Sequence, residues 1–355
     1  MKRSQRTLAD GRTILYFDND ERGERAAVDT RELPPLPLIA SELRHDRLTG
    51  DWVIIADHRQ ERTHHPSLAE CPLCPSRTHN ATEIPEEHFE VVIFENRFPS
   101  LPGMESDAGG IAGGRAEVVA FTQDHEGSLG NLSSEQMKLV ILAWIDRCQE
   151  LACLPGTRSV FVFENRGEEI GVTLHHPHGQ IYAYPFLPPY QEALIRQALM
   201  ARERGDSLIA DTVQQEIDHG SRIIVHNDYW VAFAPYASSW PLEIQLHPVR
   251  DIKRLPELNE DEINSLAVLY PHLIRSLDGV YDKPMPYMAG WIQTPCQGST
   301  DEHEVSRLFL RLVSNQRSID KLKYLASSET LMGAFILDVS PESAAELVRQ
   351  SLANS

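Results

Sequence analysis

A sequence pattern that recurs 126 positions later constrains the fold of this 355-residue chain more than any other feature. In each copy, a strand-like segment precedes two leucines and then the polar start of a helix. The first copy consists of residues 117–121, Leu129, Leu132 and residues 133–136, and the second of residues 243–247, Leu255, Leu258 and residues 259–262. A repeat of this length far exceeds a solenoid repeat, and it predicts two similar halves of domain size.

We divide the chain into four segments on this basis. Residues 1–40 form an N-terminal arm that packs on the rest, residues 41–190 the first half, residues 191–225 a helical connection, and residues 226–355 the second half. The first half opens with a predicted hairpin and contains a helix that Ser133 and Gln136 begin as a capping box. The helical connection is interrupted near Gly205.

The most unusual composition lies in residues 174–185, where three histidines, a glutamine and two tyrosines stand close together. If this stretch is a strand, the two-residue period places His176, His178, Gln180 and Tyr182 on one face. Pro177 cannot donate to a sheet ladder, so it predicts a sheet edge or a bulge.

The chemistry of these side chains suits an attack on phosphorus. A neutral imidazole at His178 has a nucleophilic lone pair if its other nitrogen is hydrogen-bonded. Gln180 offers an amide donor to an anionic oxygen, and Gly179 allows a phosphate to approach the backbone. A buried polar strand, or histidines that only bind metal, is the alternative for His-x-His. In the second copy of the repeat, the corresponding residues 307–312 contain no histidine, so the chemistry is expected in the first half.

Cys71 and Cys74 have the spacing of a metal knuckle or of a redox pair. A tetrahedral zinc site needs two further ligands, and the candidates are His79, His125 and His176. The chain contains five cysteines, an odd number that does not suit a disulfide framework in a protein of this length.

Composition argues against two classes of main partner. The formal net charge of -19 opposes binding to nucleic acid or to an anionic membrane surface. The longest apolar runs, such as residues 139–145, are too short to span a bilayer, and no secretory signal follows Met1. We therefore expect a cytoplasmic protein that holds a phosphate-bearing ligand with local donors. Arg59 and Arg62 form a candidate phosphate clamp, with solvated surface charges as the alternative.

Residues 163–167 (Phe-Glu-Asn-Arg-Gly) and 176–180 (His-Pro-His-Gly-Gln) together resemble the active-site signature of the galactose-1-phosphate uridylyltransferases, a branch of the histidine-triad superfamily. The resemblance also covers residues 51–62, Cys71, Cys74, residues 96–101, 124–125 and 323–329. It implies an α+β fold in which two similar histidine-triad-like halves share one antiparallel sheet. The first half would be catalytic and the second degenerate.

The resemblance implies that UMP is exchanged between UDP-glucose and galactose 1-phosphate, with ping-pong kinetics. His178 would be the nucleophile that forms a uridylyl-histidine, and Gln180 would hold a phosphoryl oxygen. Arg59 would contact the phosphates, and Arg62 would support it nearby. Asn96 would contact the uridine, Asn165 would orient the diphosphate, and Lys323 with Glu329 would reach the sugar.

The resemblance further implies one structural Zn²⁺, held by Cys71, Cys74, His125 and His176. It implies a homodimer in which Lys323 and Glu329 reach the site of the other subunit. Some members carry a second metal, usually iron, on histidines of the second half. This chain has Phe309-Leu310-Arg311 there and lacks a histidine near Gln293, so the second metal is predicted to be absent.

Three other functions compete with this interpretation. An ADP-glucose phosphorylase or a related adenylyltransferase would use nearly the same strand, and the base pocket at residues 96–101 would distinguish it. A zinc-stabilised nucleotide-binding protein without catalysis is a rival from another class, which intact His178 and Gln180 oppose. A redox role for Cys71 and Cys74 is a weaker possibility that a bound metal would exclude.

Overall fold

A computed structural model describes residues 1–19, 24–33, 41–61, 65–101 and 113–354. Eleven of its strands form one sheet in which every neighbouring pair is antiparallel. In sheet order these strands are β1 (Lys2–Thr7), β2 (Thr13–Asp18), β5 (Val91–Glu95), β6 (Arg115–Ala120), β8 (His178–Tyr184), β7 (Ser159–Arg166), β12 (Tyr287–Ile292), β13 (Phe309–Ser314), β11 (Leu242–Pro248), β10 (Trp230–Phe233) and β9 (Ile223–His226).

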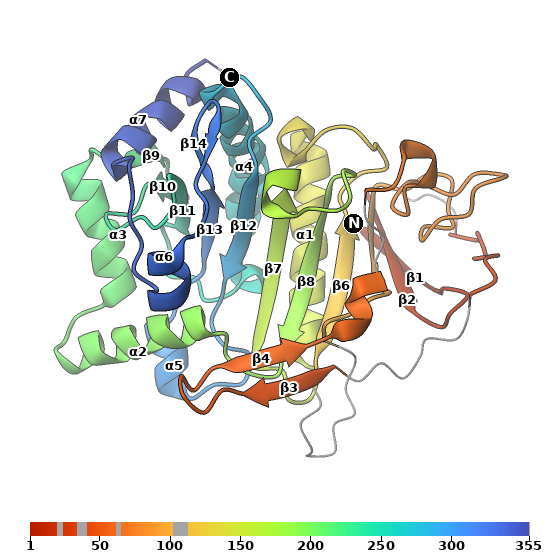
Figure 1. Ribbon diagram of the computed structural model, residues 1–355, viewed down its shortest axis with the longest axis horizontal. Helices are drawn as coiled ribbons and strands as arrows, with labels where there is room; N and C mark the ends of the chain where they lie inside the picture. Colours follow the sequence, from red (N-terminus) through yellow and green to blue (C-terminus); the bar gives the residue numbers. More distant parts are fainter. Residues whose placement is uncertain (20–23, 34–40, 62–64, 102–112, 355) are drawn as a thin grey trace.

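Helices and short elements surround this sheet (Figure 1). The α-helices are α1 (Ser134–Ala152), α2 (Pro189–Glu203), α3 (Leu208–His219), α4 (Glu260–Val280), α5 (Thr300–Val305), α6 (Ser327–Met332) and α7 (Pro341–Leu352). The 3-10 turns are η1 (Asp57–Glu61), η2 (Leu68–Glu70), η3 (Leu129–Asn131), η4 (Glu168–Ile170) and η5 (Leu255–Glu257). Two small hairpins pair β3 (Glu42–His45) with β4 (Trp52–Ile55) and β14 (Gln316–Ser318) with β15 (Lys321–Leu322).

The sheet confirms the predicted relation between the two halves. Its order is mirrored about the β7–β12 pair, because β8 and β6 follow β7 on one side as β13 and β11 follow β12 on the other. The turns η3 and η5 begin at Leu129 and Leu255, and the N-caps of α1 and α4 are Ser133 and Asn259, as the 126-residue repeat predicts.

The 126-residue repeat also aligns Glu117 of β6 with Glu243 of β11, and this part of the alignment is wrong because the two side chains lie on opposite faces of the sheet. Glu117 of β6 faces α1, where its carboxylate accepts hydrogen bonds from Arg147 at 2.8 and 2.9 Å. Glu243 of β11 faces the opposite side of the sheet and accepts a hydrogen bond from Arg311 at 2.8 Å. Side chains alternate faces along a strand, so a shift by an odd number of residues exchanges the two faces.

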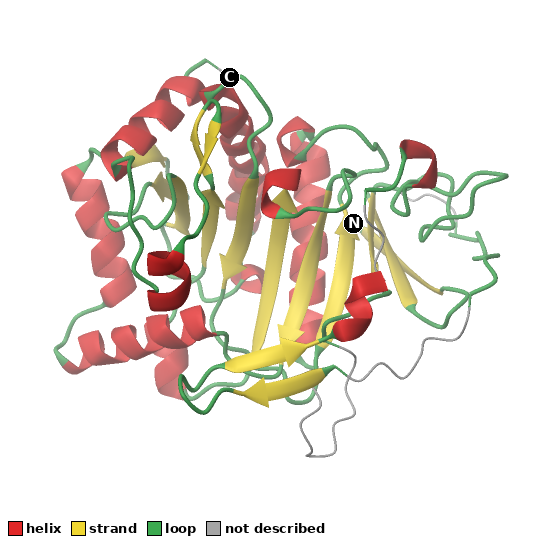
Figure 2. Ribbon diagram, viewed as in Figure 1, coloured by secondary structure: helices red, strands yellow, loops and turns green. Residues whose placement is uncertain are grey.

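The main core lies between the sheet and the two long helices α1 and α4, which stand behind the strands in Figure 2. The predicted apolar face of α1 is confirmed, because Met137, Val140, Ile141 and Trp144 are all buried. The predicted capping box is only half present. The Ser133 hydroxyl accepts from the backbone N–H of Gln136, but the amide side chain of Gln136 donates instead to the carbonyls of Glu90 and Phe121.

The opposite, front face of the sheet is partly covered by the predicted hairpin β3–β4, which crosses in front of β7 and β8 in Figure 1. Leu43 and Ile54 of this hairpin pack on a cluster that contains Tyr182 of β8. β8 lies between β6 and β7, so the edge position predicted from Pro177 is wrong. Pro177 precedes the first residue of β8, and its hydrogen bond to the segment after β6 uses only its carbonyl, which accepts from the Phe121 N–H.

The N-terminal arm joins the sheet through β2, which pairs with β5. A second buried cluster lies on the face of β2 and β5 opposite to the main core, and it includes Leu8, Ile14 and Tyr16 of the arm together with Cys71 and Leu73. The Cys-x-x-Cys segment is therefore anchored by apolar contacts. None of the helices in the described ranges is both long and apolar enough to cross a membrane.

Candidate active site

Strand β8 presents its polar side chains as the sequence predicts. Ile181 and Ala183 are buried in the helix-side core, so His178, Gln180 and Tyr182 point to the front face. The reason for Gly179 differs from the predicted one. A Cβ at this position would lie 2.6 Å from Cζ of Phe121 and 2.8 Å from the Phe163 carbonyl oxygen, so glycine is needed for packing on the helix side.

The imidazole of His178 is held in one orientation. Its Nδ1 lies 2.7 Å from the carbonyl oxygen of His176, so Nδ1–H donates there and Nε2 keeps its lone pair. Burial lowers the pKa of His178, against the opposing effect of this hydrogen bond, and the ring is therefore neutral near pH 7. A neutral, oriented imidazole is a competent nucleophile.

His178 opens onto two cavities. The first, which we call the front cavity, has a volume of about 440 Å³ and is also lined by Gln180, Asn96 and Arg59. The second, the end cavity, has a volume of about 580 Å³ and is lined by Asn165, Arg166 and His175 among others. The front cavity contains two further arginines that the sequence analysis did not select, Arg31 and Arg97.

Gln180 is oriented by a neighbour that the sequence analysis placed on the same face but gave no role. The Tyr182 hydroxyl donates to Oε1 of Gln180 at 3.1 Å. The amide nitrogen of Gln180 thus remains available as a donor, and Gln180 itself lines the front cavity.

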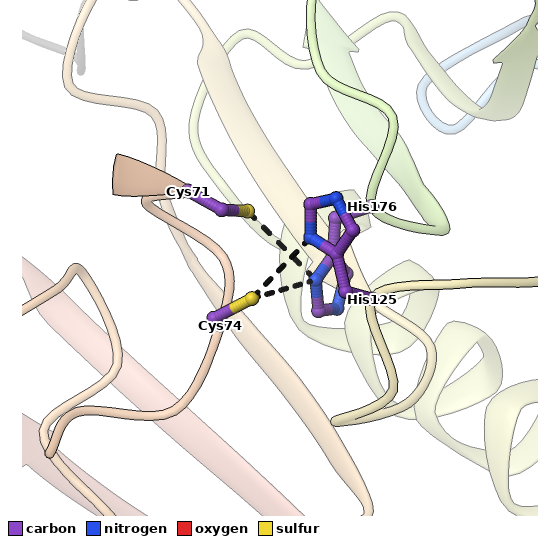
Figure 3. Close-up of side chains that lie close together, drawn as sticks. All are labelled: Cys71, Cys74, His125 and His176. Atoms are coloured by element: carbon purple, nitrogen blue, oxygen red, sulfur yellow. Dashed lines mark hydrogen bonds between the residues drawn. The ribbon is translucent and has the colours of Figure 1, made fainter. Parts of the chain in front are cut away.

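The four predicted metal ligands come together beside β8 (Figure 3). The ligand atoms of Cys71, Cys74, His125 and His176 all lie within 4.8 Å of one another. The Cys74 Sγ lies 3.4 Å from Nδ1 of His125 and 3.6 Å from Nδ1 of His176, while the Cys71 Sγ lies 3.9 Å from the latter. His79, the third candidate, is exposed and does not belong to this cluster.

The chemistry of this cluster fits a metal ion. Two thiols and two imidazoles at these separations suit tetrahedral coordination at bond lengths of about 2.0–2.3 Å. His176 donates from Nε2 to the Thr122 carbonyl at 2.8 Å, which directs the lone pair of Nδ1 at the cysteines. In the metal-free chain, burial raises the pKa of Cys74 to about 12 and lowers that of His176 to about 4. A cation would therefore replace thiol protons here.

The other predicted residues fall into two groups. Arg59 of η1 and Asn96 line the front cavity, and Asn165 of β7 lines the end cavity, so all three are close to His178. Lys323 and Glu329 form an ion pair at 2.8 Å, and neither lines a cavity of His178 within the described chain. Arg62 lies outside the described residues.

The second half has a different set of side chains on its front face. Arg311 of β13 forms an ion pair with Glu243 at 2.8 Å, and its guanidinium lies 4.8 Å from the centre of the Tyr190 ring. Phe309 stacks on His247, with ring centres 4.8 Å apart. In the second half, a cation and an aromatic stack therefore occupy the part of the front face where the first half has His178 and Gln180.

Glu164 lies behind the site, on the helix side of β7. It is buried, and its carboxylate accepts a hydrogen bond from the Tyr287 hydroxyl at 2.8 Å. Burial raises its pKa from 4.5 to about 7, against the opposing effects of this hydrogen bond and of Arg166. The native state thus binds more protons than the unfolded chain between about pH 4.5 and 7, and stability falls as the pH rises through this window.

Glu164→Gln is therefore expected to stabilise the fold at high pH only. The amide keeps an acceptor for Tyr287 and removes the buried charge. The free energy of unfolding should rise by roughly 3 kcal/mol at pH 8 and stay nearly unchanged at pH 4, where the carboxyl is protonated in both states. Urea unfolding at the two pH values measures this difference, and an equal effect at both would contradict the assignment.

Comparisons with known proteins agree with this geometry. The galactose-1-phosphate uridyl transferase N-terminal domain matches residues 33–188, and the C-terminal domain of the same family matches residues 194–354. A galactose-1-phosphate uridylyltransferase from Streptomyces lividans is 40% identical over 99% of this chain and 98% of its own length.

Solved structures show the same fold. A uridylyltransferase structure superposes with a TM-score of 0.77 and 29% identity, covering 88% of this chain and 99% of its own. An ADP-glucose phosphorylase from Arabidopsis thaliana covers 88% of this chain and 98% of its own with a TM-score of 0.69, but at 21% identity it shows the fold alone. With both halves matched in order, the chain belongs to the galactose-1-phosphate uridylyltransferase family.

Proposed function

We propose that the chain exchanges UMP between UDP-glucose and galactose 1-phosphate through a covalent intermediate on His178. The observation that carries this proposal is the His178 imidazole. Its Nδ1–H is tied to the His176 carbonyl, and the ring lines the front cavity beside Gln180 and Arg59. The family relatives are galactose-1-phosphate uridylyltransferases, and this name fits a UDP-hexose and a hexose 1-phosphate as the substrates in galactose metabolism.

The reaction consists of two displacements at one phosphorus atom. The Nε2 lone pair of His178 forms a bond to the α-phosphorus of UDP-glucose, and the bond to the bridging oxygen breaks, so glucose 1-phosphate leaves with the electron pair. A phosphate oxygen of galactose 1-phosphate then attacks the same phosphorus and returns the electron pair to Nε2. The proton stays on Nδ1 throughout, where it donates to the His176 carbonyl oxygen, and the Gln180 amide N–H donates to a phosphoryl oxygen.

The remaining roles are those that the family resemblance implies. Arg59 contacts the phosphates with Arg62 supporting it nearby, Asn96 contacts the uridine and Asn165 orients the diphosphate. Arg59, Asn96 and Asn165 all line cavities that contain His178, which supports these roles. The Cys71, Cys74, His125 and His176 cluster holds Zn²⁺ as a closed structural site that ties the strand of His178 to the Cys-x-x-Cys segment. A cytoplasmic location agrees with five free cysteines.

A mass measurement tests the covalent step. The protein is incubated separately with UDP-glucose and with ADP-glucose, without an acceptor, and then measured intact and after peptide mapping. We expect a uridylyl adduct on the peptide that contains His178. An adenylyl adduct alone would move the chain to the phosphorylase activity, and no adduct from either donor would contradict the mechanism.

Tyr182→Phe is expected to lower kcat about three- to tenfold and to change KM for UDP-glucose little. Without the hydroxyl, the Gln180 amide loses a hydrogen bond worth about 1 kcal/mol and no longer keeps one orientation toward the phosphoryl oxygen. Steady-state kinetics measure the change, with Tyr184→Phe as the matched control on the same face. Equal effects of the two variants would reject a specific role for Tyr182.

We further propose that the chain is a homodimer in which Lys323 and Glu329 serve the partner's site. Exposed apolar side chains around α6 support this, namely Tyr324, Leu331, Met332, Phe335 and Ile336. Coexpression of His178→Gly with Lys323→Ala tests it. If Lys323 acts across the interface, the mixed dimer has one intact site and regains activity, whereas action within one chain leaves both sites defective.

A further inference from the structure

We propose that His65, Glu168 and His175 form a second binding site for a divalent transition-metal ion, separate from the Cys/His cluster. Their ligand atoms all lie within 4.8 Å of one another. Nδ1 of His65 is 3.6 Å and Nε2 of His175 is 3.0 Å from the same carboxylate oxygen, Oε1 of Glu168. Ligands bound to one ion at about 2.0–2.2 Å are separated by roughly 3.0–3.6 Å, so one ion fits among the three atoms.

The donor set selects the kind of ion. Two imidazole nitrogens and one carboxylate oxygen suit Zn²⁺, Co²⁺, Ni²⁺ or Fe²⁺, whereas Ca²⁺ and Mg²⁺ prefer oxygen ligands only. The side chains of His65, His175 and Glu168 are 34%, 55% and 60% exposed. Water would therefore fill the remaining coordination positions, and the ion would exchange with solvent, unlike an ion in the Cys/His cluster, where Cys71 and His176 are 1% exposed.

The backbone brings the three ligands together before any ion binds. Glu168 begins the turn η4, which two glycines with positive φ flank, Gly167 at 105° and Gly171 at 84°. The Val172 N–H donates to the Gly167 carbonyl and closes this loop. The His65 N–H donates to the Thr173 carbonyl at 3.0 Å, and this hydrogen bond holds His65 against the loop that carries Glu168 and His175. Less conformational freedom is therefore lost on binding than in a loose loop.

The position of this site gives it a consequence for anions. His175 lines the end cavity together with His178, so a divalent ion bound to it would add positive charge at the edge of that cavity. The site is distinct from the second-half position where the sequence predicts no metal. The inference concerns metal binding and does not rest on the proposed transfer reaction.

Cobalt binding tests the site, because Co²⁺ reports its ligands. Untagged full-length protein whose Cys/His cluster is loaded with Zn²⁺ is titrated with Co²⁺ by calorimetry and by visible absorption. We expect one equivalent per chain whose weak visible bands come without a thiolate-to-cobalt charge-transfer band, since no cysteine belongs to the site. His65→Ala and Glu168→Gln should each weaken this binding at least about tenfold.

Two controls keep the result specific. His79→Ala removes another exposed histidine that is outside both clusters, and it should leave the titration unchanged. Cys153→Ser should do the same, because Cys153 is an exposed cysteine outside the metal cluster. The proposal is overturned if wild-type protein binds no Co²⁺ of this spectral kind. It is also overturned if both His65→Ala and Glu168→Gln bind Co²⁺ as wild type does, in which case the three side chains only hydrogen-bond to one another.

Discussion

His178→Gly is expected to lower kcat/KM for the exchange by about 10⁴-fold or more and to abolish the covalent adduct, because the variant has no atom that can bond to phosphorus. A loss of this size corresponds to about 5 kcal/mol of transition-state stabilisation. Steady-state assays with both substrates measure kcat/KM, and the intact mass after incubation with UDP-glucose shows whether the adduct forms.

Folding has to be separated from chemistry in this test. His178 makes its hydrogen bond to the backbone of His176 and is not a metal ligand, so the variant should keep its metal content and most of its thermal stability. His79→Ala is the matched histidine control and should be fully active. Turnover that survives in a folded His178→Gly protein would show that another group attacks phosphorus and would remove the central claim of the proposed function.

The face of β8 was predictable from sequence because the two-residue period of a strand depends on nothing beyond the strand itself. The same period predicted that His178 and Gln180 share one face of the strand, and the structure places both on the front face of the sheet. The reason for Gly179 was not predictable, since it depends on Phe121 and Phe163 of neighbouring segments. Those contacts exist only after β6, β7 and β8 have paired.

The metal ligands show the limit of spacing arguments. Spacing alone left His79, His125 and His176 as candidates for Cys71 and Cys74, and only the resemblance selected among them. The pairing of Ala120 with His178 decides the geometry, because it brings the segment after β6 alongside the residues before β8. His79 stays on the surface. The alignment of residues 117–121 with residues 243–247 was off by an odd number of positions. Such a shift exchanges the two faces of the strand but leaves the hydrophobic content of the segment almost unchanged, so the sequence did not reveal it.

Cys74→Ser is expected to remove the metal from the Cys/His cluster and to reduce both stability and activity. Loss of a structural metal should cost about 3 kcal/mol or more, which for a chain of this length corresponds to a decrease of roughly 4 °C or more in Tm. Activity should also fall by at least about tenfold, because the carbonyl that orients the His178 imidazole belongs to His176, itself a member of the cluster. The metal would thus position His178 indirectly, because it would fix His176, whose carbonyl orients the His178 imidazole.

Metal analysis, calorimetric melting and steady-state kinetics on one preparation separate these effects. The matched control is Cys153→Ser, an exposed cysteine outside the cluster, which should keep metal, Tm and kcat. A Cys74→Ser protein with wild-type metal content and Tm would contradict the site itself. A protein that loses metal and stability but keeps the wild-type kcat at low temperature would contradict only the link to His178. The orientation of the imidazole would then depend on the pairing of β8 with β6 and β7, which needs no metal to hold the His176 carbonyl in place.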